Sequence, residues 1–200
     1  LRFYKVSEIP PSLNWDEVSI GYNAYSILKT GRDEWGQSFP IHFKAYGEYK
    51  LPAQIYVSIP AIAIFGLTEI GVRITPVIYG TLTVLLIFFL GRILFQSNLA
   101  GLIASLLLAI SPWHIQLTRA SFESSLATFF VTLGILLYVY GFKNQKYFVI
   151  SMIPFALSVF TYNSARIFTP LFLLATFLIY RKQLIKFKRM VVISAVIFAV

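Results

Sequence analysis

Long runs without a charged residue, separated by short charged joints, dominate this sequence. Each run can supply a helix of roughly 17–25 residues once its ends are extended, which is the length that a ~30 Å hydrocarbon core requires. The charge-free runs are 76–90, 99–118, 124–142, 147–165, 167–180 and 190–200. We therefore predict an all-α fold: a polytopic transmembrane helical bundle with about five spans and part of a sixth.

The composition also indicates a membrane protein. Charged residues make up 12% of the chain, against about 25% in soluble domains, and the mean hydropathy is +0.74. These values exclude a disordered chain and argue against a soluble enzyme. Because the chain has no cysteine, disulfides, thiolate chemistry and zinc–cysteine sites are excluded as well.

The positions of the basic residues predict the orientation of the spans. The chain carries 17 Lys and Arg against 8 Asp and Glu, a net charge of +9. Alternate joints hold basic residues and no acid: Arg92, Lys143, Lys146, Arg181, Lys182, Lys186, Lys188 and Arg189. The positive-inside rule places these joints in the cytoplasm, so all the acids fall on the extracytoplasmic side. We interpret the basic joints as topology signals and expect no nucleic-acid partner.

Two parts of the chain differ in character. We predict that residues 1–72 form a first extracytoplasmic loop with two membrane-parallel helices, and that residues 73–200 form the transmembrane bundle. The apolar segment 51–67 contains two prolines, and a crossing there would turn the lysine-rich joints outward, so we expect it to lie along the outer interface. Since the chain begins with Leu and its last apolar run is short, we expect a fragment that is incomplete at both ends.

The first predicted helix carries two acids at its start. Asn14 can cap it, Glu17 has capping-box spacing, and Gly31 can end it. Acids in a first helical turn complement the helix dipole and need no other purpose. Asp16 and Glu17 also lie beside Trp15 in a membrane-facing loop, where partial desolvation favours base chemistry. The residues leave both interpretations open.

A second outer turn carries Arg119 and Glu123, which are four residues apart and could pair on one helix face. Alternatively, Arg119 faces a phosphate, and Glu123 positions that phosphate or a metal. Lys44 lies among aromatic residues, where it would either snorkel to the interface or hold a lipid phosphate. No charge lies in the middle of a predicted span, whereas transporters usually carry ionisable groups at membrane depth. Polar groups at the rim suit chemistry on a lipid headgroup.

Several short motifs occur in an order that resembles the GT-C glycosyltransferases. The motifs are Trp15-Asp16-Glu17-Val18, Tyr49-Lys50-Leu51-Pro52, Gly71-Val72-Arg73, and Ser111-Pro112 followed by Arg119 and Glu123. The chain looks most like the branch that contains protein O-mannosyltransferases, lipid A aminoarabinose transferases and dolichyl-phosphate-mannose-protein mannosyltransferase-like proteins. The resemblance implies two membrane-parallel helices in the first extracytoplasmic loop, a polyprenyl-phosphate sugar donor and inversion at the anomeric carbon.

The resemblance also implies roles for individual residues. Asp16, with Glu17 beside it, would act as the general base on an acceptor hydroxyl of a protein, lipid or glycan. Lys50 would hold the donor phosphate with help from Arg119. Glu123, together with Glu48, would contact lipid or a divalent metal, the one cofactor candidate. We thus expect a multi-pass glycosyltransferase of the plasma membrane with its active site on the extracytoplasmic side; the alternative is a polytopic lipid or sugar transporter or flippase.

Overall fold

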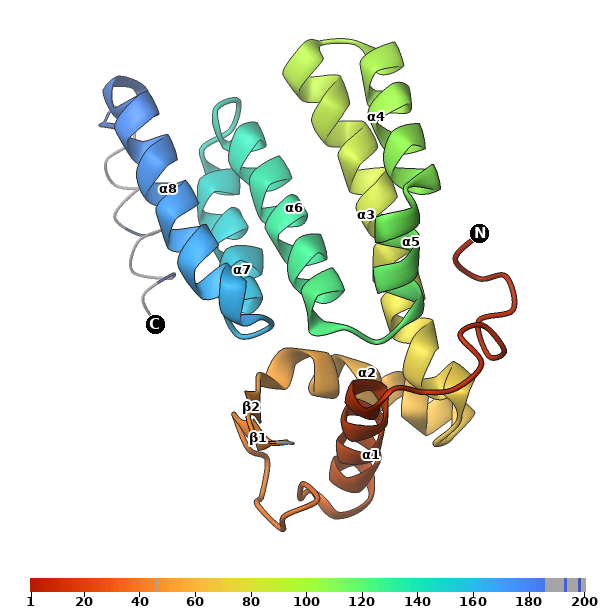
Figure 1. Cartoon of the computed structure of the whole chain (residues 1–200). Helices are drawn as coiled ribbons and strands as arrows, with labels where there is room; N and C mark the ends of the chain where they lie inside the picture. Colours follow the sequence, from red (N-terminus) through yellow and green to blue (C-terminus); the bar gives the residue numbers. More distant parts are fainter. Residues whose placement is uncertain (46, 186–192, 194–197, 199–200) are drawn as a thin grey trace.

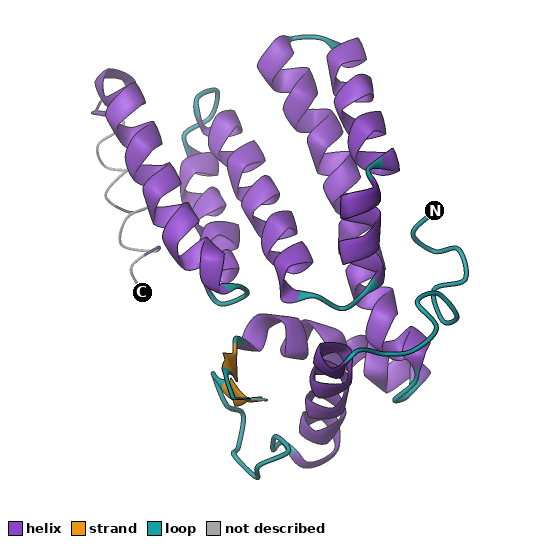
Figure 2. Ribbon diagram, in the orientation of Figure 1, coloured by secondary structure: helices purple, strands orange, loops and turns teal. Residues whose placement is uncertain are grey.

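The computed structural model describes residues 1–45, 47–185, 193 and 198. Within them the fold is all-α apart from one small hairpin, which confirms the predicted class (Figure 1, Figure 2). The helices are α1 Trp15–Thr30, α2 Pro52–Phe65, α3 Glu69–Phe95, α4 Asn98–Ile110, α5 Pro112–Arg119, α6 Glu123–Gly141, α7 Lys146–Val159 and α8 Asn163–Leu184. The strands β1 (Phe43–Lys44) and β2 (Tyr49–Lys50) pair antiparallel. Lys186, Lys188, Arg189 and nearly all of run 190–200 lie outside the described residues.

The helices form a bundle with a smaller unit at one end (Figure 1). Helices α3 and α4 pack as one pair, α6 and α7 as another, and α3 contacts α6. Helices α1 and α2 pack on each other and on α3, and the hairpin lies beside them. The α3–α4 and α6–α7 connections and the end of α8 lie at the opposite end of the bundle. This agrees with the expected alternation of basic joints and acidic loops.

Three helices in the described part of the chain, α3, α6 and α8, are long and apolar enough to cross a membrane. Helices α4 and α5 meet at an angle of 59° and form a fourth candidate if they are taken as one broken span. Helix α7 has 14 residues and rises about 21 Å, which is less than a ~30 Å core. Large apolar side chains such as Leu107 (61% exposed) and Ile167 (68% exposed) cover the outside of the bundle, as expected of helices that face lipid. The number of spans stays a prediction.

Two predicted runs have other boundaries in the structure. The second outer turn is predicted to begin at Ser111-Pro112, inside charge-free run 99–118, and the helix does break there: Ser111 is extended (φ −62°, ψ 116°). The cause is Pro112, which has no N–H to donate and disfavours helical geometry in the residue before it. Helix α5 follows the break, where only a turn is predicted. A third outer turn is predicted over residues 161–166, at the end of charge-free run 147–165, but α8 already begins at Asn163, so most of this segment forms the first turn of a helix.

Local signals place α1 as predicted. The side chain of Asn14 accepts a hydrogen bond from the N–H of Glu17, the Glu17 side chain accepts one from the N–H of Asn14, and Gly31 ends the helix in the left-handed conformation (φ 70°). The face of α1 that carries Ile20, Ala24 and Ile27 packs in the hydrophobic core. The apolar side chains of Val18, Tyr22 and Leu28 on the same helix are exposed.

Close approach of the paired helices depends on glycine. A Cβ atom on Gly101 of α4 would lie 2.6 Å from the backbone oxygen of Phe88 on α3. A Cβ atom on Gly134 of α6 would lie 2.7 Å from the ring of Phe155 on α7. Because both distances are below van der Waals contact, only glycine allows these helices to pack so closely, as is common in membrane bundles.

Candidate active site

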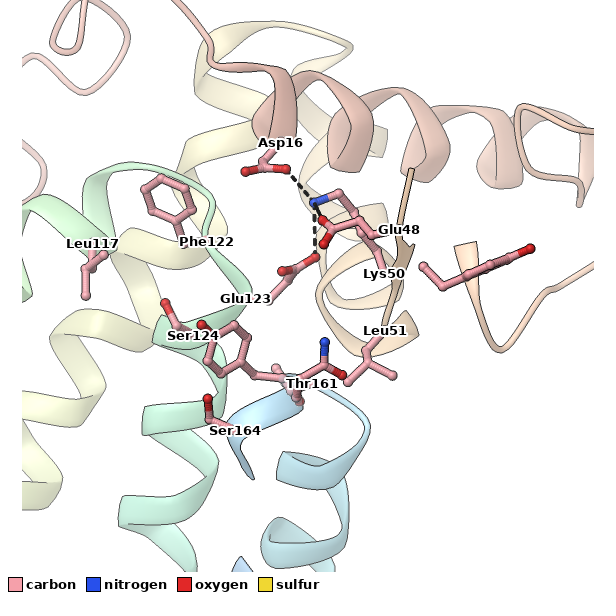
Figure 3. A pocket seen from close by; sticks show the side chains of 13 residues that line it. Asp16, Glu48, Lys50, Leu51, Leu117, Phe122, Glu123, Ser124, Thr161 and Ser164 are labelled. Atoms are coloured by element: carbon pink, nitrogen blue, oxygen red, sulfur yellow. Dashed lines mark hydrogen bonds and ion pairs between the residues drawn. The ribbon is translucent and has the colours of Figure 1, made fainter. Parts of the chain in front are cut away.

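A cavity of about 440 Å³ lies where the unit of α1, α2 and the hairpin meets the end of the bundle. Its lining comes from α1, the hairpin, the first turn of α6 and the α7–α8 turn. The charged side chains in this lining are Asp16, Glu48, Lys50 and Glu123 (Figure 3). Four of the six residues predicted to form the site therefore meet in one place.

Lys50 lies at the centre of these charges. Its Nζ atom is 2.6 Å from Oδ1 of Asp16, 3.5 Å from Oε1 of Glu123 and 3.7 Å from Oε1 of Glu48. The lysine side chain is 3% exposed, whereas that of Asp16 is 29% exposed, so the carboxylate is the more accessible partner. We call this group of four side chains the Lys50 cluster.

Three separate elements bring the Lys50 cluster together. Asp16 lies in the first turn of α1, which the Asn14 cap starts at a fixed point. Lys50 ends β2 opposite the buried Phe43 and directly precedes the N-cap of α2. Glu123 is the first residue of α6. All three groups therefore lie at element ends, on rigid backbone.

The carboxylates keep Lys50 charged. Burial alone lowers the pKa of the ammonium, but its hydrogen bond to Asp16 and the negative charges of Glu123, Asp16 and Glu48 outweigh burial, so the pKa of Lys50 lies above its ordinary value. A buried cation with accessible carboxylates beside it can bind an anion and also present a proton acceptor.

Glu17 lies apart from the cavity and is fully engaged elsewhere. It is 1% exposed, and its Oε1 atom accepts a hydrogen bond of 2.8 Å from Nε of Arg73. Its Oε2 atom accepts one of 3.2 Å from the Nη2 atom of the same guanidinium, in addition to the capping bond from Asn14. The structure thus gives Glu17 a role in holding α1 against α3. Sequence reasoning did not identify Arg73 as its partner.

Arg119 also lies outside the cavity lining. Its guanidinium donates to the backbone oxygens of Leu1 (2.9 Å), Ile9 (2.7 Å) and Lys5 (3.3 Å), so it holds the N-terminal segment. The expected pairing of Arg119 with Glu123 is absent from the described part of the chain, because α5 ends at Arg119 and a new helix begins at Glu123.

A buried hydrogen-bond network lies behind the Lys50 cluster. Gln54 on α2 is fully buried, and its Nε2 atom donates to Oγ of Ser121 at 2.9 Å. Its Oε1 atom accepts a bond of 2.7 Å from the hydroxyl of Tyr79 on α3. Gln54 is four residues after Lys50, in the first turn of α2, and Ser121 is two residues before Glu123. One side chain therefore joins the two segments that carry the cation and its buried carboxylate partner.

We expect Gln54→Leu to destabilise the protein by about 2 kcal/mol, because it removes a buried hydrogen-bond partner from both the Tyr79 hydroxyl and Ser121. The measurement is the apparent thermal unfolding of the intact protein in detergent, with Gln116→Leu on the exposed surface of α5 as the matched control. Adding Tyr79→Phe should restore part of the loss, since it removes the hydroxyl that lost its Gln54 partner. Equal unfolding of Gln54→Leu and the control would contradict the role of this network.

The described residues do not form a metal site of the expected kind. They contain no group of three or more His, Asp or Glu side chains placed to hold a metal ion. The carboxylates of Asp16, Glu48 and Glu123 instead surround the Lys50 ammonium. The residues present therefore do not fit the divalent metal that was a candidate.

Comparison with known proteins identifies the family. The family described as dolichyl-phosphate-mannose-protein mannosyltransferase matches residues 52–200. The chain belongs to this family. The match confirms the resemblance seen in the sequence, and together with the apolar helices it identifies a membrane protein. The match to this mannosyltransferase family includes Arg119 and Glu123 but begins after Asp16, Glu48 and Lys50.

A relative from Aquifex aeolicus (strain VF5), described as an uncharacterized protein, is 30% identical over 129 residues. The aligned region is 62% of the chain but 26% of the relative, so the chain spans about a quarter of the length of this relative. No solved structure matches the chain.

Proposed function

We propose that this family member transfers a sugar from a polyprenyl-phosphate donor to an acceptor hydroxyl, with inversion at the anomeric carbon. The observation that carries the proposal is the contact of 2.6 Å between Asp16 and the buried Lys50 in a cavity at the end of a membrane bundle. A lipid phosphate at the membrane surface would reach such a cavity while its hydrocarbon chain stays in the bilayer. The family description names a lipid-linked sugar of this class as the donor.

In the proposed reaction, the donor phosphate takes the place of the Asp16 carboxylate on the Lys50 ammonium. The released carboxylate accepts the proton of the acceptor hydroxyl, and the acceptor oxygen forms a bond to the anomeric carbon. The bond from that carbon to the phosphate oxygen breaks, and the electron pair leaves with the polyprenyl phosphate. Lys50 stabilises this departing negative charge, while Glu123 keeps the ammonium in place.

We place the active site on the extracytoplasmic side of the plasma membrane. The support is the position of the cavity at the end of the bundle opposite the α3–α4 and α6–α7 connections, in or next to which Arg92, Lys143 and Lys146 lie. The positive-inside rule assigns such connections to the cytoplasm. The acceptor is a hydroxyl of a protein, a lipid or a glycan.

The experiment that tests the proposal is transfer of labelled sugar from a polyprenyl-phosphate donor to acceptors in a membrane extract by the intact protein. We expect a labelled acceptor and an equal amount of free polyprenyl phosphate. Movement of the labelled donor across the bilayer without cleavage would instead support the flippase alternative.

Replacing Lys50 with Ala should raise the donor KM about tenfold or more, because a charge-assisted hydrogen bond to the phosphate contributes roughly 1.5–3 kcal/mol. Lys44→Ala is the matched control, since this lysine is on the same hairpin but packs over the Trp35 ring at 4.6 Å. The measurement is initial velocity against donor concentration. An unchanged donor KM for Lys50→Ala would remove the lysine from the phosphate site.

A further inference from the structure

The wall of the cavity that faces the Lys50 cluster is polar but uncharged. Figure 3 shows Ser124, Thr161 and Ser164 on the far side of Glu123 from Asp16. This wall consists of the first turn of α6 and the turn that leads into α8. Its residues that carry a hydrogen-bonding side chain are Ser124, Thr161, Tyr162, Asn163 and Ser164.

In the part of the chain that the structure describes, most of these side chains have no hydrogen-bond partner. Thr161 donates to the backbone oxygen of Leu157. Within the described residues, the side chains of Ser124, Tyr162, Asn163 and Ser164 make no hydrogen bond. The four charged residues of the Lys50 cluster are, by contrast, paired with one another. The neutral wall therefore holds unused donors and acceptors that face the same cavity as the charges.

The chemistry of this wall matches a sugar ring. An asparagine amide and serine hydroxyls both donate and accept hydrogen bonds, as the hydroxyls of a neutral sugar require. Tyr162 is 38% exposed, so its ring is accessible to the apolar C–H face of a sugar. A phosphate, which only accepts hydrogen bonds, would use the Lys50 side of the cavity rather than this wall.

We propose, on the basis of the function proposed above, that Tyr162, Asn163 and Ser164, with Ser124, bind the sugar ring of the donor. Lys50 binds the phosphate in the same cavity, so the sugar–phosphate bond lies between the two walls. A volume of about 440 Å³ is within the usual range for a small-molecule site. The α7–α8 turn then determines which sugar the protein accepts, because unpaired polar groups reject a ring that lacks the matching hydroxyl.

The test compares four lipids that differ only in whether a sugar is present and which sugar it is. The intact protein in detergent is titrated with polyprenyl phosphate and with the mannosyl, glucosyl and arabinosyl phosphates of the same polyprenol. We expect Asn163→Ala to weaken binding of the best sugar-linked lipid about tenfold and to leave the affinity for polyprenyl phosphate unchanged. Asn98→Ala is the matched control, because Asn98 is also exposed and is also the first residue of a helix, α4, at the other end of the bundle. The double change of Asn163 and Ser164 to Ala should weaken the sugar-linked lipid further.

Each other result would count against the inference. If Asn163→Ala and the double change bind the sugar-linked lipid as the wild type does, while the wild type transfers sugar, the inference is wrong and the proposed function stands. An equal loss for both lipids would show that the turn supports the phosphate or the fold. If the wild type binds the lipids with and without sugar equally and transfers no sugar, both proposals fail.

Discussion

Asp16→Asn should lower the turnover number for sugar transfer by about 10²–10⁴, the usual contribution of a general base. The amide has nearly the same shape and its oxygen can still accept a hydrogen bond from Lys50, which lies 2.6 Å from the carboxylate. What the change removes is the ability to take a proton from the acceptor hydroxyl. The donor KM should change little, because Lys50 and the neutral wall of the cavity remain unchanged.

The matched control for this variant is Glu69→Gln. Glu69 is an exposed acid in the first turn of α3, as Asp16 is an acid in the first turn of α1. If Asp16 only complements the helix dipole, both changes should have the same small effect, about 0.3–1 kcal/mol on stability. The measurement is the initial rate at saturating donor and acceptor, together with thermal unfolding.

Glu123 is the rival base in the same cavity. Its Oε1 atom is buried and lies 3.5 Å from Lys50 Nζ, and its side chain is 19% exposed against 29% for Asp16. Asp16 has the closer contact with the ammonium and the greater access to an incoming acceptor. Loss of turnover in Glu123→Gln but not in Asp16→Asn would transfer the role of base to Glu123.

Local sequence signals predicted the start and end of α1 correctly, because a capping box and a left-handed glycine depend on neighbours within a few residues. The charge-free runs predicted the all-α class for the same reason, since helix length and apolarity are local properties. The outer turn predicted to begin at Ser111-Pro112 does break the helix there, although the run remains apolar through the proline. There the local backbone constraint of Pro112 opposed the hydrophobic pattern and prevailed.

The site depends on contacts that no local pattern contains. Asp16, Lys50 and Glu123 come from three segments, and only the fold shows that they share one cation. Gln54 lies in the apolar segment 51–67, and nothing in its neighbours indicates that it joins Tyr79 to Ser121. Arg73 stands at the start of a span, where an arginine usually snorkels, so its burial against Glu17 could not be predicted from its neighbours.

Arg73→Met should destabilise the protein by about 3–5 kcal/mol, which is the typical cost of leaving a buried charge without its partner. Arg73 is fully buried and donates to both oxygens of Glu17. It also donates to the backbone oxygens of Val6 (3.2 Å), Pro10 (2.8 Å) and Ser12 (2.7 Å). The methionine side chain has similar length and no hydrogen-bond donor. Glu17 and three backbone carbonyls would therefore lose the hydrogen bonds that Arg73 donates to them inside the protein. The measurement is the apparent unfolding midpoint of the intact protein, with protease cleavage within residues 1–14 as a second readout.

Two further variants distinguish the loss of the Arg73–Glu17 ion pair from the general effect of removing an arginine. Arg92→Met changes an exposed arginine at the other end of the same helix and should alter stability by less than about 0.5 kcal/mol. Adding Glu17→Gln to Arg73→Met should recover part of the loss, because it removes the uncompensated buried carboxylate. Asp16 is the residue before Glu17, so release of α1 in Arg73→Met should also lower the turnover number for sugar transfer. Adding Glu17→Gln should restore the stability of the protein more than it restores sugar transfer. Equal stability of Arg73→Met and Arg92→Met would show that the guanidinium does not hold α1 in place.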